Sequence, residues 1–409
     1  MAELARFSPW LTIIGIGEDG ISGLGAEAKR RIAAADLVCG GVRHLELAAS
    51  IITGEQHRWL SPIEKSVAVI KAARGRDICV LASGDPFHFG MGATLARSID
   101  DAEMVTIPAP SSFSLAASRL GWALQDVALV SLHGRPLDLI RPHLQPGARI
   151  LALTSDETGP RRLAALLTAT GFGASGFTVL EALGGARERV TRHRATDFAL
   201  DSVDTLNVCA IEVVAGKAAR VLPLAAGLDD GLFEHDGQIT KREVRALTLS
   251  ALGPRKGELL WDIGGGSGSI SIEWMLANPS MRAIAIEANA ERAERIGRNA
   301  TSFGVPGLHV VTGSAPGALK DLPAPDAVFI GGGGSDPGVI AAGIAALGAG
   351  GRLVANAVTL EMEAILLAHQ ARLGGSLIRI DVSRASPVGS MQGWRPAMPV
   401  TQWNWVRKD

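Results

Sequence analysis

The stretch from residue 259 to residue 287 constrains the fold more than any other part of the chain. It reads LLWDIGGGSGSISIEWMLANPSMRAIAIE: an apolar run, a glycine cluster, a helical segment, a second apolar run and a final glutamate. The apolar runs Leu259–Ile263 and Ala283–Ile286 have the length and composition of buried parallel strands. The pattern therefore predicts a strand–loop–helix–strand unit of a parallel α/β fold.

The same stretch predicts a ligand that contains a ribose. Glycine lets the loop turn tightly, and it lets a ligand lie against the backbone without meeting a Cβ atom. Glu287 stands at the end of the second apolar run, where a carboxylate can accept both hydroxyls of a ribose. The alternative is a tight turn without a ligand. The glycines, the strands and the acid together favour the ligand.

The loop Gly-Gly-Gly-Ser-Gly at 264–268, with Asp262 two residues before it, resembles the first motif of the class I S-adenosylmethionine (SAM)-dependent methyltransferases. The ligand of that family has no phosphate, whereas a dinucleotide places its pyrophosphate at a helix N-terminus. The resemblance implies a methyl-donor site rather than a hydride-donor site. The cofactor contacts that it implies are Gly264, Gly265, Gly266, Ser267, Gly268, Glu287, Ser314, Ala315 and Thr240.

Length and composition exclude several classes of protein. A chain of 409 residues is too long for one ordinary core and suggests two or three domains. The net charge of −1 gives no global basic field for nucleic acid or an anionic membrane, and we expect neither partner. No apolar run reaches the ~20 residues of a membrane span.

The cysteines predict a reducing compartment. Cys39, Cys79 and Cys209 are far apart and lie in apolar runs, which is typical of core thiols rather than of a disulfide framework or a metal site. The N-terminus shows no basic region followed by a long apolar stretch. We therefore expect a cytoplasmic protein without a bound metal.

The first half contains a literal G-x-G-x-x-G at 15–20, but its context does not fit a dinucleotide-binding turn. The following helix begins only near Ala26, and no strand ending in an acid follows about 20 residues later. The loop at 83–92 is unusual because it combines glycines with a histidine and two phenylalanines, although these could simply plug the core. The serines in 108–113 could do no more than cap the next helix.

These three loops, at these separations, resemble the tetrapyrrole (corrin and porphyrin) methyltransferase family. The resemblance spans residues 11–214 and implies two α/β lobes with SAM folded between them. Family members usually carry a proline shortly after the second glycine of the first loop, where this chain has Glu18-Asp19-Gly20. The resemblance implies that the loop Gly15–Gly20 faces the tetrapyrrole macrocycle of the substrate. It places the cofactor against Ser83, Gly84, Asp85, His88, Ser111 and Ser112.

The domain organisation follows from these two resemblances. We predict a tetrapyrrole methyltransferase domain at 1–215, with lobes at about 1–120 and 121–215, a linker at 216–230 and a class I methyltransferase/decarboxylase domain at 231–409. The last domain should have a Rossmann-like sheet of seven strands. Thr240 and Glu243 are spaced as a capping box for its first helix. The run Ser383–Pro399 is expected to form a long loop near the active edge.

The second half is also similar to precorrin methylases that act late in cobalamin synthesis, on the residues 264–268, 314–315, 331–334 and 356–361. A tetrapyrrole-methylase half fused to such a half implies two SAM sites, one per domain. It implies methylation of carbon 5 of a precorrin by the first half. The second half would methylate carbon 15 and remove carbon dioxide from the ring C acetate. Relatives of the second half form tetramers, so the resemblance also implies a homo-oligomer.

The implied substrate carries many carboxylates, which are natural partners of arginine. No catalytic acid or base can be assigned from the sequence. Four arginines and one glutamate are nevertheless candidate substrate contacts. Each arginine could equally be an ordinary surface charge, and the glutamate could be an ordinary acid at a helix N-terminus. The candidate substrate contacts are Arg119, Arg135, Arg384, Arg395 and Glu361.

Other functions stay open at this point. They are a nicotinamide dehydrogenase, a single-site methyltransferase with an N-terminal substrate-binding module, an RNA methyltransferase and a non-catalytic corrinoid-binding protein. The near-neutral charge and the absence of tyrosine disfavour RNA. A dehydrogenase is disfavoured because neither glycine loop has the companion residues that hydride transfer from a dinucleotide requires.

Overall fold

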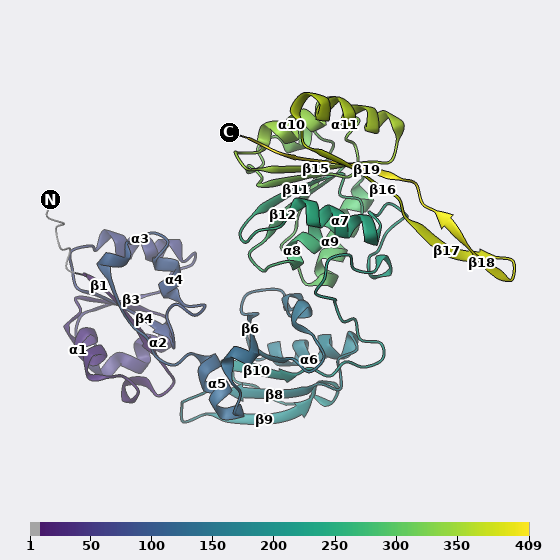
Figure 1. Cartoon of the computed structure of the whole chain (residues 1–409). Coiled ribbons are helices and arrows are strands. Elements are labelled where there is room, and N and C mark those ends of the chain that lie inside the picture. The colour runs from purple at the N-terminus through teal and green to yellow at the C-terminus, as the bar shows by residue number, and fades with distance from the viewer. Residues whose placement is uncertain (1–8, 409) are drawn as a thin grey trace. The chain divides into compact units, whose positions relative to one another are not determined.

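In the computed structural model, residues 9–408 are described, and they fall into two compact units (Figure 1). The N-terminal unit comprises the residues up to 137 together with 145–220. The C-terminal unit comprises 138–144 together with the residues from 221 onward.

The first sheet of the N-terminal unit is parallel, with the strand order β3-β2-β4-β1-β5. Helices α1 and α2 cover one face and α3 and α4 the other, which explains why the central strands β1 and β4 are apolar and buried. The loops after β1, β4 and β5 leave the same edge. The elements are β1 (Leu11–Ile16), α1 (Ala26–Ala34), β2 (Leu37–Gly40), α2 (Val42–Ala48), β3 (Glu55–Arg58), α3 (Glu64–Ala72), β4 (Ile78–Ser83), α4 (Met91–Leu95) and β5 (Met104–Ile107).

The second sheet of this unit has the order β6-β7-β10-β8-β9 and is mixed, since only β6 and β7 run parallel. Helix α5 packs on it through Phe113 and Ala117. The elements are α5 (Ser112–Leu120), β6 (Val127–Ser131), β7 (Arg149–Leu153), α6 (Gly159–Ala169), β8 (Gly176–Glu181), β9 (Arg189–Arg194) and β10 (Asn207–Glu212). The predicted two-lobed α/β fold is confirmed. The sequence did not indicate β3 and β9, because these exposed edge strands are polar.

The C-terminal unit is built on a seven-stranded sheet with the order β13-β12-β11-β14-β15-β19-β16, which confirms the predicted Rossmann-like fold. Its strands are parallel except β19, which runs antiparallel to both of its neighbours. The strands are β11 (Leu259–Ile263), β12 (Arg282–Glu287), β13 (His309–Thr312), β14 (Ala327–Ile330), β15 (Arg352–Ala357), β16 (Ser376–Ile380) and β19 (Val400–Val406).

The sheet of the C-terminal unit has a switch point between β11 and β14. From β11 the chain continues to β12 and β13 on one side, and it then returns to place β14 and β15 on the other. Ligands of open α/β sheets bind at such a point, at the carboxyl ends of the strands. Helices α7 (Arg242–Leu252), α8 (Ser269–Leu276) and α9 (Ala290–Phe303) cover one face of the sheet. Helices α10 (Val339–Ala346) and α11 (Leu360–Leu373) cover the other.

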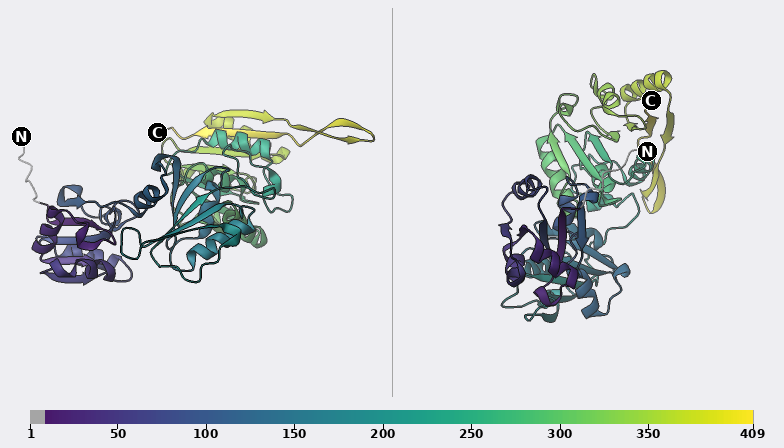
Figure 2. Two further views of the ribbon diagram at one scale, coloured as in Figure 1. Left: turned by 90° about the horizontal axis from the view of Figure 1, so that it is seen from below. Right: turned by 90° about the vertical axis from the view of Figure 1, so that its left-hand side faces the viewer.

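The prediction of a long loop over Ser383–Pro399 is wrong. Strands β17 (Ser383–Val388) and β18 (Met391–Pro396) form an antiparallel hairpin that projects from the unit, as Figure 1 and the left view of Figure 2 show. The turn has two residues, and Gly389 in it has φ = 60°, as tight hairpin turns require. The Gly-Ser pair was therefore a usable signal, but the prolines and the weak alternation of apolar residues concealed the strands.

The capping box predicted at the start of α7 is also wrong. The helix begins at Arg242 with Lys241 as its N-cap, and no side chain caps it. Glu243 instead pairs with Arg384 of β17. The spacing of two residue types cannot show that a distant arginine competes for the acid.

Candidate cofactor and substrate site

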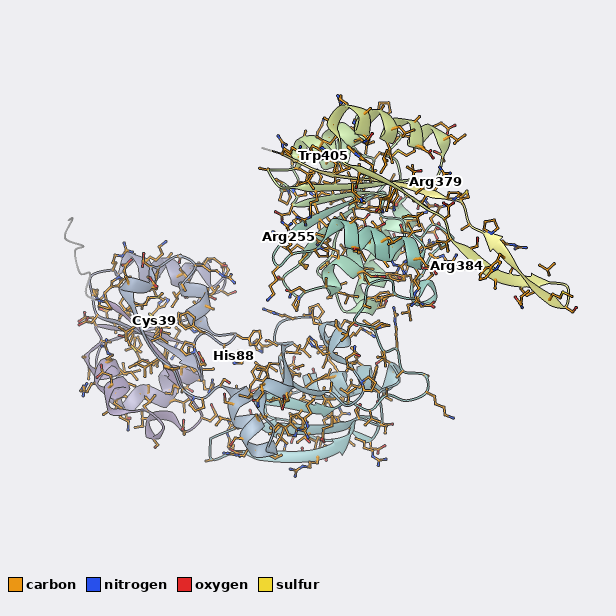
Figure 3. The ribbon with its side chains drawn as sticks, in the orientation of Figure 1. Cys39, His88, Arg255, Arg379, Arg384 and Trp405 are labelled. Atoms are coloured by element: carbon orange, nitrogen blue, oxygen red, sulfur yellow. The ribbon has the colours of Figure 1, made fainter. Side chains whose placement is uncertain are left out.

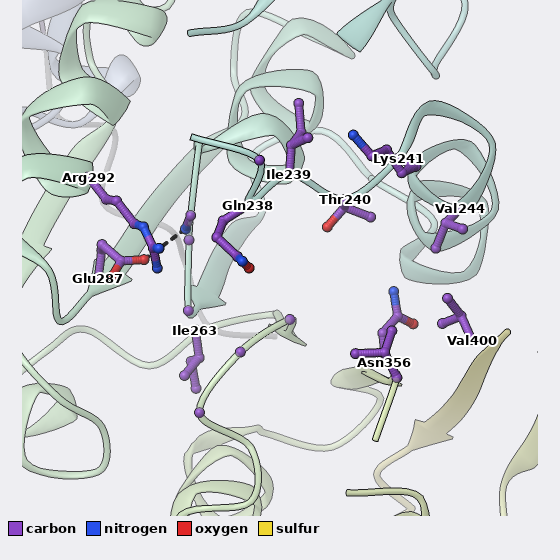
Figure 4. A pocket seen from close by; sticks show the side chains of 18 of the residues that line it. Gln238, Ile239, Thr240, Lys241, Val244, Ile263, Glu287, Arg292, Asn356 and Val400 are labelled. Atoms are coloured by element: carbon purple, nitrogen blue, oxygen red, sulfur yellow. Dashed lines mark hydrogen bonds between the residues drawn. The ribbon is translucent and has the colours of Figure 1, made fainter. Parts of the chain in front are cut away.

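A pocket of about 530 Å³ opens at the carboxyl ends of β11, β12, β14 and β15 (Figure 4). Its volume lies in the range of small-molecule sites in proteins, and it lies at the switch point of the sheet. The predicted cofactor residues that line it are Thr240, Gly264, Gly265, Gly266, Glu287, Ser314 and Ala315. The predicted residues Ser267 and Gly268 do not: Ser267 is buried and Gly268 is the N-cap of α8.

Two glycine loops form the narrow floor of the pocket. Gly264 has φ = +75°, and a Cβ atom on it would lie 2.6 Å from the backbone of Gly332 in the loop after β14. A side chain at this position would therefore collide with the second loop. The N–H groups of Gly264 and Gly265 donate to the carbonyl of Ile286, which ties the first loop to β12. The backbone is thus exposed to a ligand and is held rigidly.

The carboxylate of Glu287 is oriented by the backbone on both of its oxygens. Oε2 accepts from the N–H of Gly266 at 2.8 Å, and Oε1 accepts from the N–H of Asn289 at 2.9 Å. Glu287 is only 6% exposed, yet it lines the pocket (Figure 4). Each oxygen retains acceptor capacity for a ligand hydroxyl. The geometry suits recognition of a ribose.

A segment at 237–241 closes one side of the pocket and is anchored at both ends. Before it, Asp236 accepts from Nε of Arg292 at 2.8 Å, and Arg292 itself lines the pocket beside Glu287 (Figure 4). At the other end, the buried Arg245 donates to the carbonyl of Thr240. Sequence reasoning did not find Arg292 as a lining residue, because its position depends on the ion pair with Asp236.

Arg245 lies at the centre of a buried polar network. Its Nε donates to Glu273 at 2.5 Å and its Nη1 to Asp230 at 3.0 Å. Glu273 also accepts from the N–H groups of Gly227 and Leu228, at 2.6 and 3.0 Å. The network fixes the segment before α7, and with it the wall of the pocket, to α7 and α8.

Asp262 lies behind the pocket rather than in it. Its carboxylate is buried in β11 and accepts from N and Oγ of Ser271, at 3.1 and 2.7 Å. Burial raises the pKa of Asp262 to about 7; the hydrogen bonds from Ser271 oppose this effect and the charge of Glu287 adds to it. Asp262 therefore fixes α8 to β11 and titrates near neutral pH.

This titration predicts a pH dependence of stability. The pKa of Asp262 is higher in the folded chain than the ~3.9 of an unfolded aspartate, so the folded state binds more protons between about pH 4 and pH 7. The contribution of Asp262 to stability is therefore lost as the pH rises through this window. The variant Asp262→Asn should lack this loss. Urea unfolding of both proteins at about pH 5.5 and pH 8 measures it, and parallel pH profiles would contradict the assignment.

In the N-terminal unit, the predicted residues gather at the shared edge of the first sheet. The N–H of Gly84 donates to Ile16 O, and the N–H of Ala109 donates to Gly84 O, both at 3.2 Å. A Cβ atom on Gly15 would lie 1.9 Å from Gly84 O. The loops after β1, β4 and β5 are therefore in backbone contact, as the carboxyl ends of parallel strands allow.

The side chains at this edge have partners of their own. Oγ of Ser83 lies 2.8 Å from Nε2 of His44, and Ser111 caps α5 by accepting from Ser114 N at 3.1 Å, with Ser112 as the first helical residue. Asp85 accepts from Phe87 N at 2.9 Å. His88 follows β4 (Figure 3), and its ring lies 5.1 Å from those of Phe89 and Phe113. The two phenylalanines of the loop, Phe87 and Phe89, are exposed and do not plug the core, whereas Phe113 of α5 is buried.

The structure separates the five candidate substrate contacts. Arg384 lines the pocket of the C-terminal unit. Arg119 forms a bidentate pair with Glu188, at 2.5 and 3.0 Å. Arg135, Glu361 and Arg395 are exposed and are not among the lining residues, although Arg395 stands directly opposite Arg384 on the hairpin.

Among residues 9–408, no group of three or more His, Cys, Asp or Glu side chains is placed to hold a metal ion. Within the same residues, no helix combines the length and the apolar character needed to cross a membrane.

Comparison with known proteins assigns each half to a family. Residues 11–199 match the family described as tetrapyrrole (corrin/porphyrin) methylases, and residues 231–407 match the precorrin methyltransferase domain. A precorrin-6Y C(5,15)-methyltransferase (decarboxylating) from Sinorhizobium sp. is 72% identical over 99% of this chain and 98% of its own length. The chain belongs to the precorrin-6Y C(5,15)-methyltransferase family. This membership confirms the two resemblances found in the sequence.

Two methyltransferases from Salmonella typhimurium are each similar to only part of this chain. A cobalt-precorrin-6B C(15)-methyltransferase (decarboxylating) is 34% identical over 40% of the chain and 85% of its own length. A cobalt-precorrin-7 C(5)-methyltransferase is 31% identical over 44% of the chain and 88% of its own length.

Proposed function

We propose that this chain is a bifunctional SAM-dependent methyltransferase of cobalamin biosynthesis. It methylates carbons 5 and 15 of a late precorrin, precorrin-6Y or precorrin-6B, and removes carbon dioxide from the ring C acetate to give precorrin-8. The observation that carries this proposal is the 72% identity, along nearly the whole chain, to a relative named for both methylations and for decarboxylation.

The two activities are divided between two domains. The tetrapyrrole methyltransferase domain at 1–215 methylates carbon 5. The class I domain at 231–409, joined to it by a linker at 216–230, methylates carbon 15 and decarboxylates. The Salmonella relatives support this division, because each is named for one of the two methylations and matches less than half of the chain.

Each domain has its own SAM site, and the pocket of the C-terminal unit fits one of them. Bound SAM supplies an already activated methyl group, so the protein mainly aligns the acceptor carbon and excludes water. The loop at 264–266 admits the ligand because its three residues are glycines and carry no Cβ atoms. Glu287 accepts the ribose hydroxyls with a carboxylate that two backbone N–H groups already hold in place. Ser314 and Ala315 contact the adenine end.

The second SAM site lies at the shared edge of the first sheet in the N-terminal unit. Ser83, Gly84, Asp85, His88, Ser111 and Ser112 line it in this proposal. The backbone contacts among the loops after β1, β4 and β5 support it, since they bring these residues to one edge. The loop at 15–20 faces the macrocycle.

We also propose that the protein forms a homo-oligomer through its C-terminal unit and works in the cytoplasm. The three cysteines support the second point, because all are unpaired and buried (Cys39 in Figure 3) and burial raises the pKa of Cys39 and Cys79 to about 12. A monomeric mass in light scattering would contradict the oligomer.

Product analysis tests the proposed function. The intact chain is incubated with methyl-labelled SAM and a late precorrin that carries the ring C acetate, and methyl transfer and carbon dioxide release are both measured. The proposal predicts two labelled methyl groups and one carbon dioxide per macrocycle. A product with one methyl group would instead support a single-site methyltransferase whose N-terminal half only binds substrate.

A further inference from the structure

The pocket of the C-terminal unit extends beyond the glycine loops to a second end. This end is bounded by the start of α7, the end of β15 and both roots of the β17–β18 hairpin. Its apolar wall is formed by Val244, Val358, Ile380, Val382 and Val400. In Figure 4, Val244 and Val400 lie on the opposite side of the pocket from Glu287. In the proposed function, this end faces the acceptor rather than the cofactor.

One polar residue of this end is held in a fixed orientation. Nδ2 of Asn356 donates to Oγ1 of Thr248 at 3.1 Å, and its Oδ1 accepts from Nε2 of Gln402 at 2.9 Å. Both Thr248 and Gln402 are buried. Asn356 is therefore part of a rigid wall, and the charges that can recognise an acceptor lie at the rim.

Arg384 supplies a positive charge at the rim. It stands on β17 at the root of the hairpin (Figure 3) and pairs with Glu243 in the first turn of α7. Both residues line the pocket, and their side chains are 47% and 45% exposed. An ion pair that is so open to solvent contributes little to stability. Glu243 is therefore a weakly held partner that another carboxylate can replace.

The hairpin adds a second positive charge beside the first. Arg395 on β18 is the direct cross-strand partner of Arg384, so both side chains project from the same face of the hairpin. Like charges placed directly opposite each other destabilise an antiparallel pair of strands. Within residues 9–408, the acid that pairs with this couple of arginines is Glu243, which pairs with Arg384. The face carries an excess of positive charge, which suits an anionic ligand.

We propose that Arg384 binds a carboxylate of the acceptor macrocycle and that Glu243 is an internal substitute which this carboxylate displaces. The inference rests on the proposed function, because the precorrin acceptor is what supplies a ring with carboxylate arms. The apolar wall takes the ring, and the guanidinium groups at the rim take the arms. A carboxylate and a guanidinium form two parallel hydrogen bonds, which fixes position as well as affinity. Arg384 is thus a specificity residue for polycarboxylate acceptors.

The structure offers a matched control pair in the same unit. Arg379 on β16 pairs with Glu363 on α11 at 3.4 Å, and these side chains are 56% and 27% exposed. Like Arg384 and Glu243, they join a strand to a helix near the surface. Neither is among the residues that line the pocket. The same arginine-to-glutamine substitution in both pairs therefore separates loss of a surface ion pair from loss of an acceptor contact.

The test uses the intact chain and the variants R384Q, E243Q and R379Q. Carbon dioxide release gives the KM for the precorrin, and calorimetry gives the affinity for SAM. R384Q should raise the KM for the precorrin about 10-fold or more, because a charged hydrogen-bonded contact contributes ~1.5–3 kcal/mol. E243Q should lower this KM several-fold, since the competing carboxylate is gone. R379Q should match the wild type, and the affinity for SAM should stay within about twofold in all three.

Two results would overturn the inference: a KM for R384Q like that of R379Q, or a KM that rises in E243Q. If the wild-type chain releases no carbon dioxide, the proposed function fails instead. Binding of uroporphyrin, a stable porphyrin whose arms all end in carboxylates, still tests the inference in that case. Weaker binding by R384Q than by R379Q supports it, and equal binding contradicts it.

Discussion

Replacing Glu287 with glutamine should weaken SAM binding in the C-terminal unit about 100-fold or more. The neutral amide replaces both charged acceptors of the ribose hydroxyls with one neutral oxygen and an N–H₂ group. This N–H₂ group meets either Gly266 N–H or Asn289 N–H, which both donate to Glu287 in the native chain. Hydrogen bonds to a charged group contribute ~1.5–3 kcal/mol each. The loss of two such contacts corresponds to about a 100-fold or greater fall in affinity.

The measurement combines calorimetry with the product assay. E287Q should show one weakened SAM site and no carbon dioxide release at moderate SAM concentrations. The matched control is E291Q, which removes the same charge from the exposed start of α9, where Glu291 pairs with Arg295 at 3.0 Å. Carbon dioxide release by E287Q with a wild-type KM for SAM would contradict the assigned role of Glu287.

Replacing Arg245 with methionine should destabilise the C-terminal unit by about 3–5 kcal/mol, the usual result of removing one partner of a buried ion pair. Glu273 would remain buried without its cation, and the carbonyls of Leu228 and Thr240 would lose their donor. Methionine keeps most of the volume, so the charge and the hydrogen bonds dominate the effect. The affinity for SAM should fall as well, because the segment at 237–241 loses an anchor.

Urea unfolding measures this prediction. The control R298M removes an arginine whose ion pair with Glu234 is exposed on both sides, and it should change stability by less than about 1 kcal/mol. The double variant R245M/E273Q should recover part of the loss, because glutamine removes the unpaired charge and its one carbonyl oxygen can still accept from one of the two N–H groups, of Gly227 and Leu228, that donate to Glu273. A cost for R245M no larger than that for R298M would contradict the proposed importance of the network.

The features that the sequence predicted well are local ones. The run from Leu259 to Glu287 contains a strand, its loop, a helix and the next strand in order. This one stretch therefore predicted both the glycine loop and Glu287, which line the pocket. The central strands of the first sheet, β1 and β4, were predicted equally well, because strands buried on both faces are continuous apolar runs. Two α/β folds follow from such patterns.

The features that the sequence did not predict depend on contacts between distant residues. The pocket is closed by segments near 240, 356 and 380–400, and their approach is decided by the sheet order. Arg119 and Arg384 look alike as candidates. The fold pairs Arg119 with an acid 69 residues away and places Arg384 at the pocket. No residue spacing contains that information.

The number of SAM molecules bound by the intact wild-type chain tests the central claim most directly. Calorimetry should give two molecules per chain, one for the loops of the N-terminal unit and one for the pocket beside Glu287. A single site that E287Q removes would contradict the two-site account and would leave the N-terminal unit as a substrate-binding module. Absence of binding would contradict the account as a whole.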